Sequence, residues 1–218
     1  MVGGFFLDYG WNFGRMEKKE VRIMRRLIGR LKEAGVRFDA GMTALELDRA
    51  EECFGFRFPR EIREFLMLAV PVGEEFFDYR DCSQENLERF AEFYGEMERR
   101  FQFDLENCRV FLLELVGQKL GYAKDGPGFD EAVMKYWRES VRLVPFYAHR
   151  CFFDGMNDMP IVSFWQPVDT IVYGGNFLHY LEQEFLVEYA SEEDFRDFSW
   201  EELMERLQGT GIWGQLIE

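Results

Sequence analysis

The chain has 218 residues, of which 47% are hydrophobic and 17% aromatic, and its formal net charge is −15 at pH 7. This apolar content excludes a mainly disordered chain, and the acidic excess argues against direct binding to nucleic acids, whose phosphates are neutralised by lysine and arginine. The N-terminus lacks the basic start of a secretory signal and the apolar runs are too short to span a bilayer, so a cytoplasmic protein without membrane contact is predicted.

We interpret residues 1–14 as an N-terminal extension and residues 15–218 as a single domain. Apolar residues share one helical face from Lys18 to Ala34, and basic residues lie mostly elsewhere on this helix. The segment Arg15 to Arg37 has nine basic and three acidic residues, net +6, which leaves −21 for the rest. We therefore expect the helix to dock onto its own acidic domain and not onto a membrane.

Two shorter helices are predicted next. Thr43 is followed three residues later by Glu46, the spacing of a capping box, so a helix is expected to begin there and to end at Gly55. Pro59 suits the first position of a further helix, Arg60 to Leu68.

The middle of the chain mixes helix and strand signals. An amphipathic helix is predicted from Leu87 to Met97. The alternation around Phe101 and Phe103 and the apolar run from Val110 to Val116 favour two strands. Another helix is expected from Glu131 to Arg142.

Three short strands are predicted next, at Leu143–Ala148, Ile161–Trp165 and Asp169–Tyr173. Their connections are too short for parallel crossovers, which indicates an antiparallel meander, and Pro167 predicts a bulge or a longer turn in the last hairpin. Helices at Phe177–Tyr189 and Trp200–Leu207 complete the pattern. The predicted fold class is α+β, a twisted antiparallel sheet flanked by helices.

Catalytic signatures are missing from the sequence. Gly121 to Gly128 has the glycine spacing of a phosphate-binding loop without its Lys-Ser/Thr, and the four cysteines form no C-x-x-C pair. With only His149 and His179 available, we predict no metal site, no cofactor, no catalytic residue and no enzymatic activity.

Several short motifs, in order, resemble the SUKH superfamily, the proteins similar to the Smi/Knr cell-wall-synthesis regulator. The resemblance covers about 18–188 and leaves 189–218 as a C-terminal helical segment. It rests on the Gly55 to Pro59 step, Tyr79-Arg80-Asp81, the strand-start motif Phe103–Asn107, the strand Pro145–Arg150 and the closing segment Asp169–Phe185. The sequence departs from the family pattern at Tyr79, where tryptophan is usual, and at Ala148, where glycine precedes His-Arg.

The resemblance implies the same antiparallel sheet flanked by helices and, in bacteria, a frequent role as an immunity protein that blocks a polymorphic toxin. Many such toxins act on nucleic acids through basic active sites, which an acidic surface would complement. We therefore expect a non-enzymatic protein-binding module whose partner is a basic protein, namely a toxin domain. The alternatives are a regulatory scaffold of the Smi/Knr type and a binder of small anions near His149, Arg150 and Asp169.

Partner contacts are predicted in the acidic loops. The candidate residues are Asp78, Tyr79, Arg80, Asp81, Asp154, Asp158, Glu192, Glu193 and Asp194. Trp165 is a further aromatic candidate, although a position in the core is favoured for it. His149 and Arg150 are interpreted either as an anion site or, preferably, as a hydrogen-bonded structural pair that ties the sheet to a neighbouring carboxylate.

Overall fold

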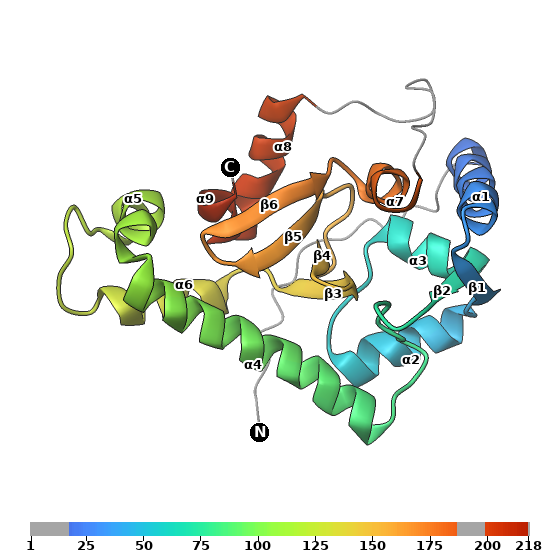
Figure 1. Cartoon of the computed structure of the whole chain (residues 1–218), viewed down its shortest axis with the longest axis horizontal. Helices are drawn as coiled ribbons and strands as arrows, with labels where there is room; N and C mark the ends of the chain where they lie inside the picture. Colours follow the sequence, from blue (N-terminus) through green and yellow to red (C-terminus); the bar gives the residue numbers. More distant parts are fainter. Residues whose placement is uncertain (1–17, 187–198, 218) are drawn as a thin grey trace.

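A computed structural model describes residues 18–186 and 199–217 and confirms the α+β class. At its centre lies a four-stranded antiparallel meander (Figure 1). Its strands, in spatial and chain order, are β3 (Leu143–Tyr147), β4 (Arg150–Phe153), β5 (Ile161–Gln166) and β6 (Asp169–Gly174). The meander was predicted with three strands, and β4 was missed because the turn before it carries no Asn-Gly or Asp-Gly signal.

The N-terminal part forms helices around a small second sheet. These elements are α1 (Lys18–Glu33), β1 (Arg37–Ala40), α2 (Ala44–Phe54), α3 (Arg60–Leu68) and β2 (Ala69–Val72), with β1 and β2 paired antiparallel. The capping box of Thr43 and Glu46 is present, and Gly55 ends α2 in the left-handed region at φ 68°. The predicted starts and ends of α2 and α3 are thus confirmed, whereas the two four-residue strands were not predicted.

Two predicted strands are wrong, because helices α4 (Gln84–Asn107) and α5 (Arg109–Leu120) occupy both segments. Buried residues of α4 include Phe90, Met97 and Phe101, which recur at helical spacing. Phe101 is fully buried and Phe103 is 49% exposed, so the two rings that suggested an alternating strand point to different sides of a helix. The motif Phe103–Asn107, expected as a strand start, forms the last turn of α4.

Three of the remaining helices follow the predicted order: α6 (Phe129–Glu139), α7 (Phe177–Phe185) and α8 (Trp200–Leu207). The 3-10 turn at Gln208–Thr210 and the short helix α9 (Trp213–Leu216) were not predicted. No helix in residues 18–186 or 199–217 combines the length and apolar character that a membrane crossing needs.

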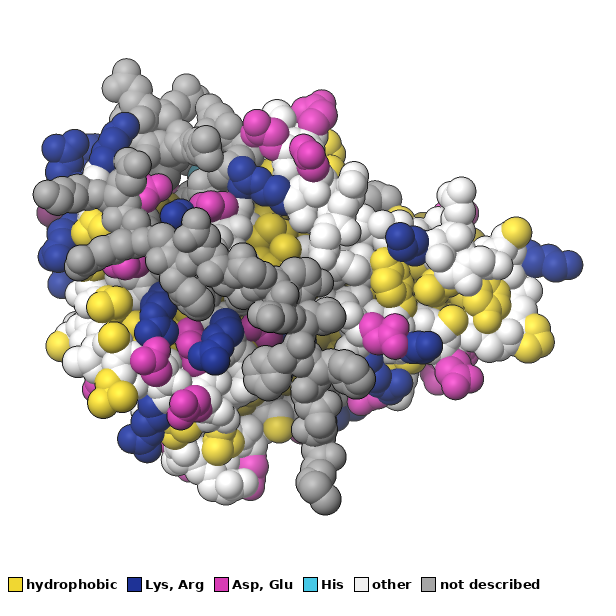
Figure 2. All heavy atoms as spheres, turned by 180° about the vertical axis from the view of Figure 1, so that it is seen from behind, with side chains coloured by type: hydrophobic (Ala, Val, Ile, Leu, Met, Phe, Trp, Pro, Cys, Tyr) yellow, Lys and Arg dark blue, Asp and Glu magenta, His cyan; other side chains and the backbone are white. Residues whose placement is uncertain are grey.

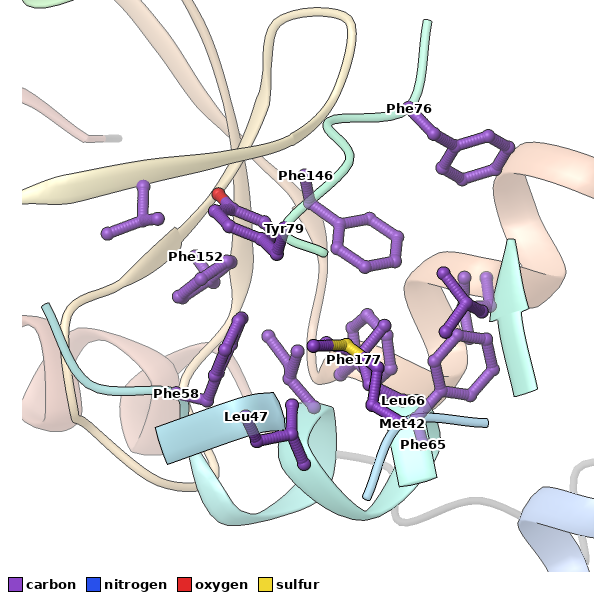
Figure 3. Close-up of a cluster of buried hydrophobic side chains, with 14 of the residues drawn as sticks. Met42, Leu47, Phe58, Phe65, Leu66, Phe76, Tyr79, Phe146, Phe152 and Phe177 are labelled. Carbon is purple, nitrogen blue, oxygen red and sulfur yellow. The ribbon is translucent and has the colours of Figure 1, made fainter. Parts of the chain in front are cut away.

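The four-stranded sheet separates two hydrophobic cores. Val144 and Phe152 belong to a first core shared with α1, α2, α3 and α7, part of which Figure 3 shows. Leu143 and Phe153 belong to a second core shared with α5, α6, α8 and α9. Successive strand residues point to opposite faces, so the same strands supply both cores. The long helix α4 contributes Phe90 to the first core and other residues to the second.

Helix α1 docks onto the domain as the sequence predicted. Its residues Met24, Leu27 and Leu31 are buried in the first core. On its polar side the Arg30 guanidinium lies 2.6 Å from the Glu182 carboxylate of α7, whose side chain is almost fully buried. Figure 2 shows Lys and Arg side chains gathered at the end of the molecule where α1 lies.

Candidate functional site

A surface pocket of about 380 Å³ opens beside the turn between β3 and β4. Its walls come from the loop before α4, from α4 itself, from β3 with its turn, and from β5. The lining residues are Glu75, Phe77, Arg89, Phe93, Pro145, Phe146, Tyr147, Ala148, His149 and Trp165. The lining is mostly aromatic, with one carboxylate and one guanidinium, a composition typical of binding surfaces.

Trp165 is 53% exposed at the edge of this pocket, so the prediction of a core position is wrong. The pairing of β5 with β6 shifts register between Phe164 and Gln166, which leaves Trp165 as the extra residue of a β-bulge. Bulges change the direction of a side chain relative to the regular strand. The bulge predicted from Pro167 is therefore confirmed, and the residue that it affects is the exposed tryptophan.

Helix α4 fixes the hairpin that carries Trp165. The Arg100 guanidinium lies over the indole ring, 4.5 Å from its centroid, and also donates to the Trp165 carbonyl. One turn later, the buried Asp104 carboxylate accepts a hydrogen bond of 3.0 Å from the backbone of Val168. Trp165 is thus exposed and at the same time held in place by neighbouring side chains.

The turn between β3 and β4 contains one residue with strained backbone. Ala148 adopts φ 47°, in the left-handed region that glycine favours. Its amide donates to the Glu75 carbonyl at 2.8 Å, which ties the turn to the loop on the other side of the pocket. The ring of His149 lies 5.8 Å from that of Trp165 in an edge-to-face arrangement. Burial and the neighbouring Arg150 lower the pKa of His149, which favours the neutral form of its ring.

Arg150 makes the structural contact with a carboxylate that the sequence led us to prefer. Its guanidinium donates to Glu184 of α7 at 2.9 Å and to Ser163 of β5 at 3.0 Å, and it stacks on the Tyr173 ring at 3.6 Å. It also contacts the His149 ring. Arg150 does not line the pocket, and neither does Asp169, so the expected anion site of His149, Arg150 and Asp169 is not assembled there.

Tyr79 is buried, which contradicts its prediction as an exposed partner contact. Figure 3 shows its ring among the aromatic residues of the first core. Its hydroxyl donates to the carbonyl of Pro145, and the Tyr94 hydroxyl donates to that of Leu143 at 2.9 Å. Both carbonyls belong to β3, the edge strand of the sheet, so these tyrosines satisfy backbone groups that would otherwise lack a strand partner.

The charged neighbours of Tyr79 are also engaged within the molecule. Arg80 makes a two-pronged contact with the Asp78 carboxylate, 2.9 Å at each nitrogen, and reaches Asp39 of β1 at 2.8 Å. These contacts lower the pKa of Asp78 against the opposing effect of its partial burial. Asp81 is exposed, but its carboxylate accepts from the backbone and hydroxyl of Ser83, the residue that caps α4.

The second predicted acidic loop caps helix α3. Asp154 accepts from the backbone of Arg57 at 2.8 Å and from the Arg142 guanidinium at 2.7 Å. Asn157 accepts from the backbone of Arg60, which supplies the helix cap that Pro59 cannot provide. The Asp158 side chain is 58% exposed and lies 3.6 Å from the Arg60 guanidinium.

The structure places His149 and Trp165 in the pocket, whereas none of the predicted acidic residues that it describes lines the pocket. Asp78, Arg80 and Asp154 stabilise loops, and Glu192, Glu193 and Asp194 lie outside the described residues. The pocket was missed, and Trp165, although named as an aromatic candidate, was expected in the core even though Pro167 indicated an irregular hairpin at that point. In the described part of the chain, no group of three or more His, Cys, Asp or Glu side chains is arranged to hold a metal ion.

Comparisons with known proteins found no match among family models, curated proteins or solved structures.

Proposed function

We propose that this chain is a non-enzymatic protein-binding module of the immunity type, which neutralises a basic toxin domain in the cytoplasm. The observation that carries the proposal is Trp165, which is half-exposed, held by Arg100 and placed at the edge of an aromatic pocket. The pocket and its rim, comprising Glu74, Glu75 and Trp165, form the proposed interface.

Tryptophan and arginine are the residues on which binding energy at protein interfaces is concentrated. An exposed indole that is already fixed loses little conformational entropy when a partner covers it. The cation–π contact with Arg100 and the bulge of β5 provide this fixation in the free protein. The pocket beside the indole offers space for a side chain of the partner.

Charge supports a basic partner. The chain carries −15, and Glu74 and Glu75 are exposed on the loop that borders the pocket. A negative field accelerates encounter with a positively charged protein and weakens as salt is added. The acidic residues that the sequence singled out are largely paired internally, so the proposed interface moves from those loops to the rim of the pocket.

A small anion is a less suitable ligand for the same pocket. Arg89 and Glu75 both line it, so their opposite charges offset each other, and the lowered pKa of His149 disfavours a positive charge on its ring. Arg150, which contacts His149, is already bound to Glu184. These observations favour a protein partner over an anionic metabolite.

The resemblance to the SUKH superfamily is part of this proposal. In its support, Ala148 has a backbone conformation suited to the glycine of the family pattern, and Tyr79 fills the aromatic position of its motif from within the core. The motif at Phe103–Asn107 argues the other way, because it is helical here.

The proposal is tested by titrating the protein with toxin domains encoded in the genome of its host and measuring affinity by calorimetry. We expect the wild type to bind one basic toxin domain and to inhibit it, with affinity that falls as salt rises. Trp165→Ala should weaken binding at least about tenfold, which corresponds to about 1.4 kcal/mol.

The matched control is Trp200→Ala, since Trp200 of α8 is 49% exposed and does not line the pocket. It should leave affinity unchanged. The pocket is ruled out as the interface if the two variants weaken binding equally, or if Trp165→Ala binds the toxin domain as tightly as the wild type does. If the wild type inhibits none of the toxin domains, the result counts against the immunity role itself.

A further inference from the structure

The solvent-facing side of α1 is a basic surface on an acidic protein. Its exposed basic side chains, which we call the basic face of α1, are Lys19, Arg22, Arg25, Arg26 and Lys32. At 3.6 residues per turn these positions fall within an arc of roughly 140°, opposite Met24, Leu27 and Leu31 of the first core. They extend over about 20 Å along the helix axis. Figure 2 shows Lys and Arg side chains gathered at this end of the molecule.

The domain does not neutralise the charges of this face. Within the described part of the chain, Lys19, Arg22 and Arg25 make no ion pair, and the printed ion pair of α1 belongs to its neighbouring Arg30. Arginines of α4 and β4, by contrast, are paired, and the guanidinium of Arg100 lies 2.9 Å from a carboxylate. Because acidic residues outnumber basic ones by 41 to 26, a shortage of carboxylates does not explain the difference. The basic face is therefore available to an anionic partner from outside the chain.

Gly29 lies at the centre of the basic face. Arg25 and Arg26 precede it by about one helical turn, and Lys32 follows it by about one turn. A Cβ atom built on Gly29 meets no atom within 4 Å, so the fold of this chain does not require glycine there. Glycine inside a helix is destabilising relative to alanine. What Gly29 provides is a flat position between cations, at which the backbone of a partner can approach closely.

We propose that the basic face of α1 is a docking surface for an acidic segment of a partner protein, which lies across Gly29. Carboxylates of this segment would pair with Arg22, Arg25 and Lys32, so charge complementarity defines the occupant. The surface is separate from the pocket beside Trp165, to which no residue of α1 contributes, and the proposal does not depend on the immunity role.

The width of the basic face favours a narrow partner over other polyanions. One helix is about 10–12 Å wide, and the chain outside residues 15–37 carries −21. A nucleic-acid duplex or a bilayer extends beyond one helix and would bring its phosphates close to this negative charge. A helix that lies in a membrane surface also inserts its apolar side, which α1 buries in the first core. A single acidic segment meets neither obstacle.

The experiment titrates the full chain into a fluorescent peptide of about twelve residues, long enough to follow the basic face, with glutamate at every third or fourth position. Fluorescence anisotropy measures binding. We expect saturable binding that weakens as salt rises, and no binding of a peptide with glutamine in place of each glutamate. A DNA duplex and vesicles of phosphatidylcholine and phosphatidylserine, measured in the same buffer, should bind more weakly than the acidic peptide.

Three variants locate the binding. Arg22→Gln combined with Arg25→Gln should weaken binding of the acidic peptide at least about fivefold. Arg99→Gln combined with Arg138→Gln removes the same charge from exposed side chains of α4 and α6 and should leave affinity unchanged. Gly29→Leu should also weaken binding but should melt no lower than the wild type, because nothing packs against Gly29 and leucine favours a helix more than glycine does.

The inference is overturned if the acidic peptide does not bind, or if the glutamine peptide binds equally well. It is also overturned if the variants at Arg22 and Arg25 or at Gly29 bind as tightly as the wild type, or if the duplex or the vesicles bind more tightly than the peptide. Sedimentation velocity of the free chain tests a second copy as the occupant. A dimer that Arg22→Gln with Arg25→Gln abolishes would assign the face to self-association and would likewise overturn the inference.

Discussion

Glu61, in the first turn of α3, is a buried carboxylate with an incomplete set of partners. One oxygen accepts from the backbone of Asp158 at 3.0 Å, and the other is buried without a hydrogen-bond partner. Burial raises the pKa of Glu61 from 4.5 to about 7. Between these two values the folded state retains a proton that the unfolded state has released, so the contribution of Glu61 to stability falls as pH rises.

We predict that Glu61→Gln removes this pH dependence. The unfolding free energy of the wild type should fall between pH 5 and pH 8 because of Glu61, and the variant should lack this loss. The difference in unfolding free energy between the variant and the wild type should therefore be larger at pH 8 than at pH 5 by up to about 3 kcal/mol, which follows from the shift in pKa. Urea unfolding at the two pH values measures it. Glu64→Gln on the same helix is the control, and a similar pH response in both variants would contradict the role given to Glu61.

At the scale of elements, Glu51 joins α2 to the start of α3. Its side chain is 6% exposed and accepts from Arg57 at 2.7 Å, from Arg63 at 3.0 Å and from the backbone of Phe58 at 3.1 Å. Removal of the carboxylate leaves the buried amide of Phe58 without an acceptor and takes one ion-pair partner from each of Arg57 and Arg63. These contacts explain why the two helices hold a fixed position across the Gly55–Pro59 connection.

We therefore predict that Glu51→Ala lowers the unfolding free energy by about 2–3 kcal/mol in urea titrations at pH 7. Its neighbour Glu52 is exposed on the same helix, and Glu52→Ala should change stability by no more than about 0.5 kcal/mol. If both variants had the same small effect, the Glu51 contacts would not contribute to the packing of α2 against α3.

At the scale of the whole molecule, the two cores share the strands of one sheet. Phe65 is fully buried in the first core, 5.1 Å from Phe177 between ring centroids, whereas α9 belongs to the second core. Phe65→Ala should lower stability by about 3–5 kcal/mol. Because the sheet couples both cores, we expect hydrogen exchange of the α9 amides to accelerate by a corresponding amount. Unchanged protection of α9 would show that the second core is stable on its own.

The sequence by itself determined the features that depend on neighbours within one or two turns. Thr43 with Glu46, Gly55 and Pro59 set the bounds of α2 and α3, and the short connections between strands required an antiparallel meander. Caps, turns and short loops act locally, so their signals are complete within a few residues.

Only the tertiary structure decided which residues are buried and which distant residues meet. Phe101 and Phe103 fit a strand or a helix over a short window, and the second core selected the helix. Tyr79 is buried where its hydroxyl donates to a carbonyl of the edge strand. Trp165 is exposed because a bulge turns its side chain outward. Packing and strand register depend on contacts between remote segments, and local sequence patterns do not specify them.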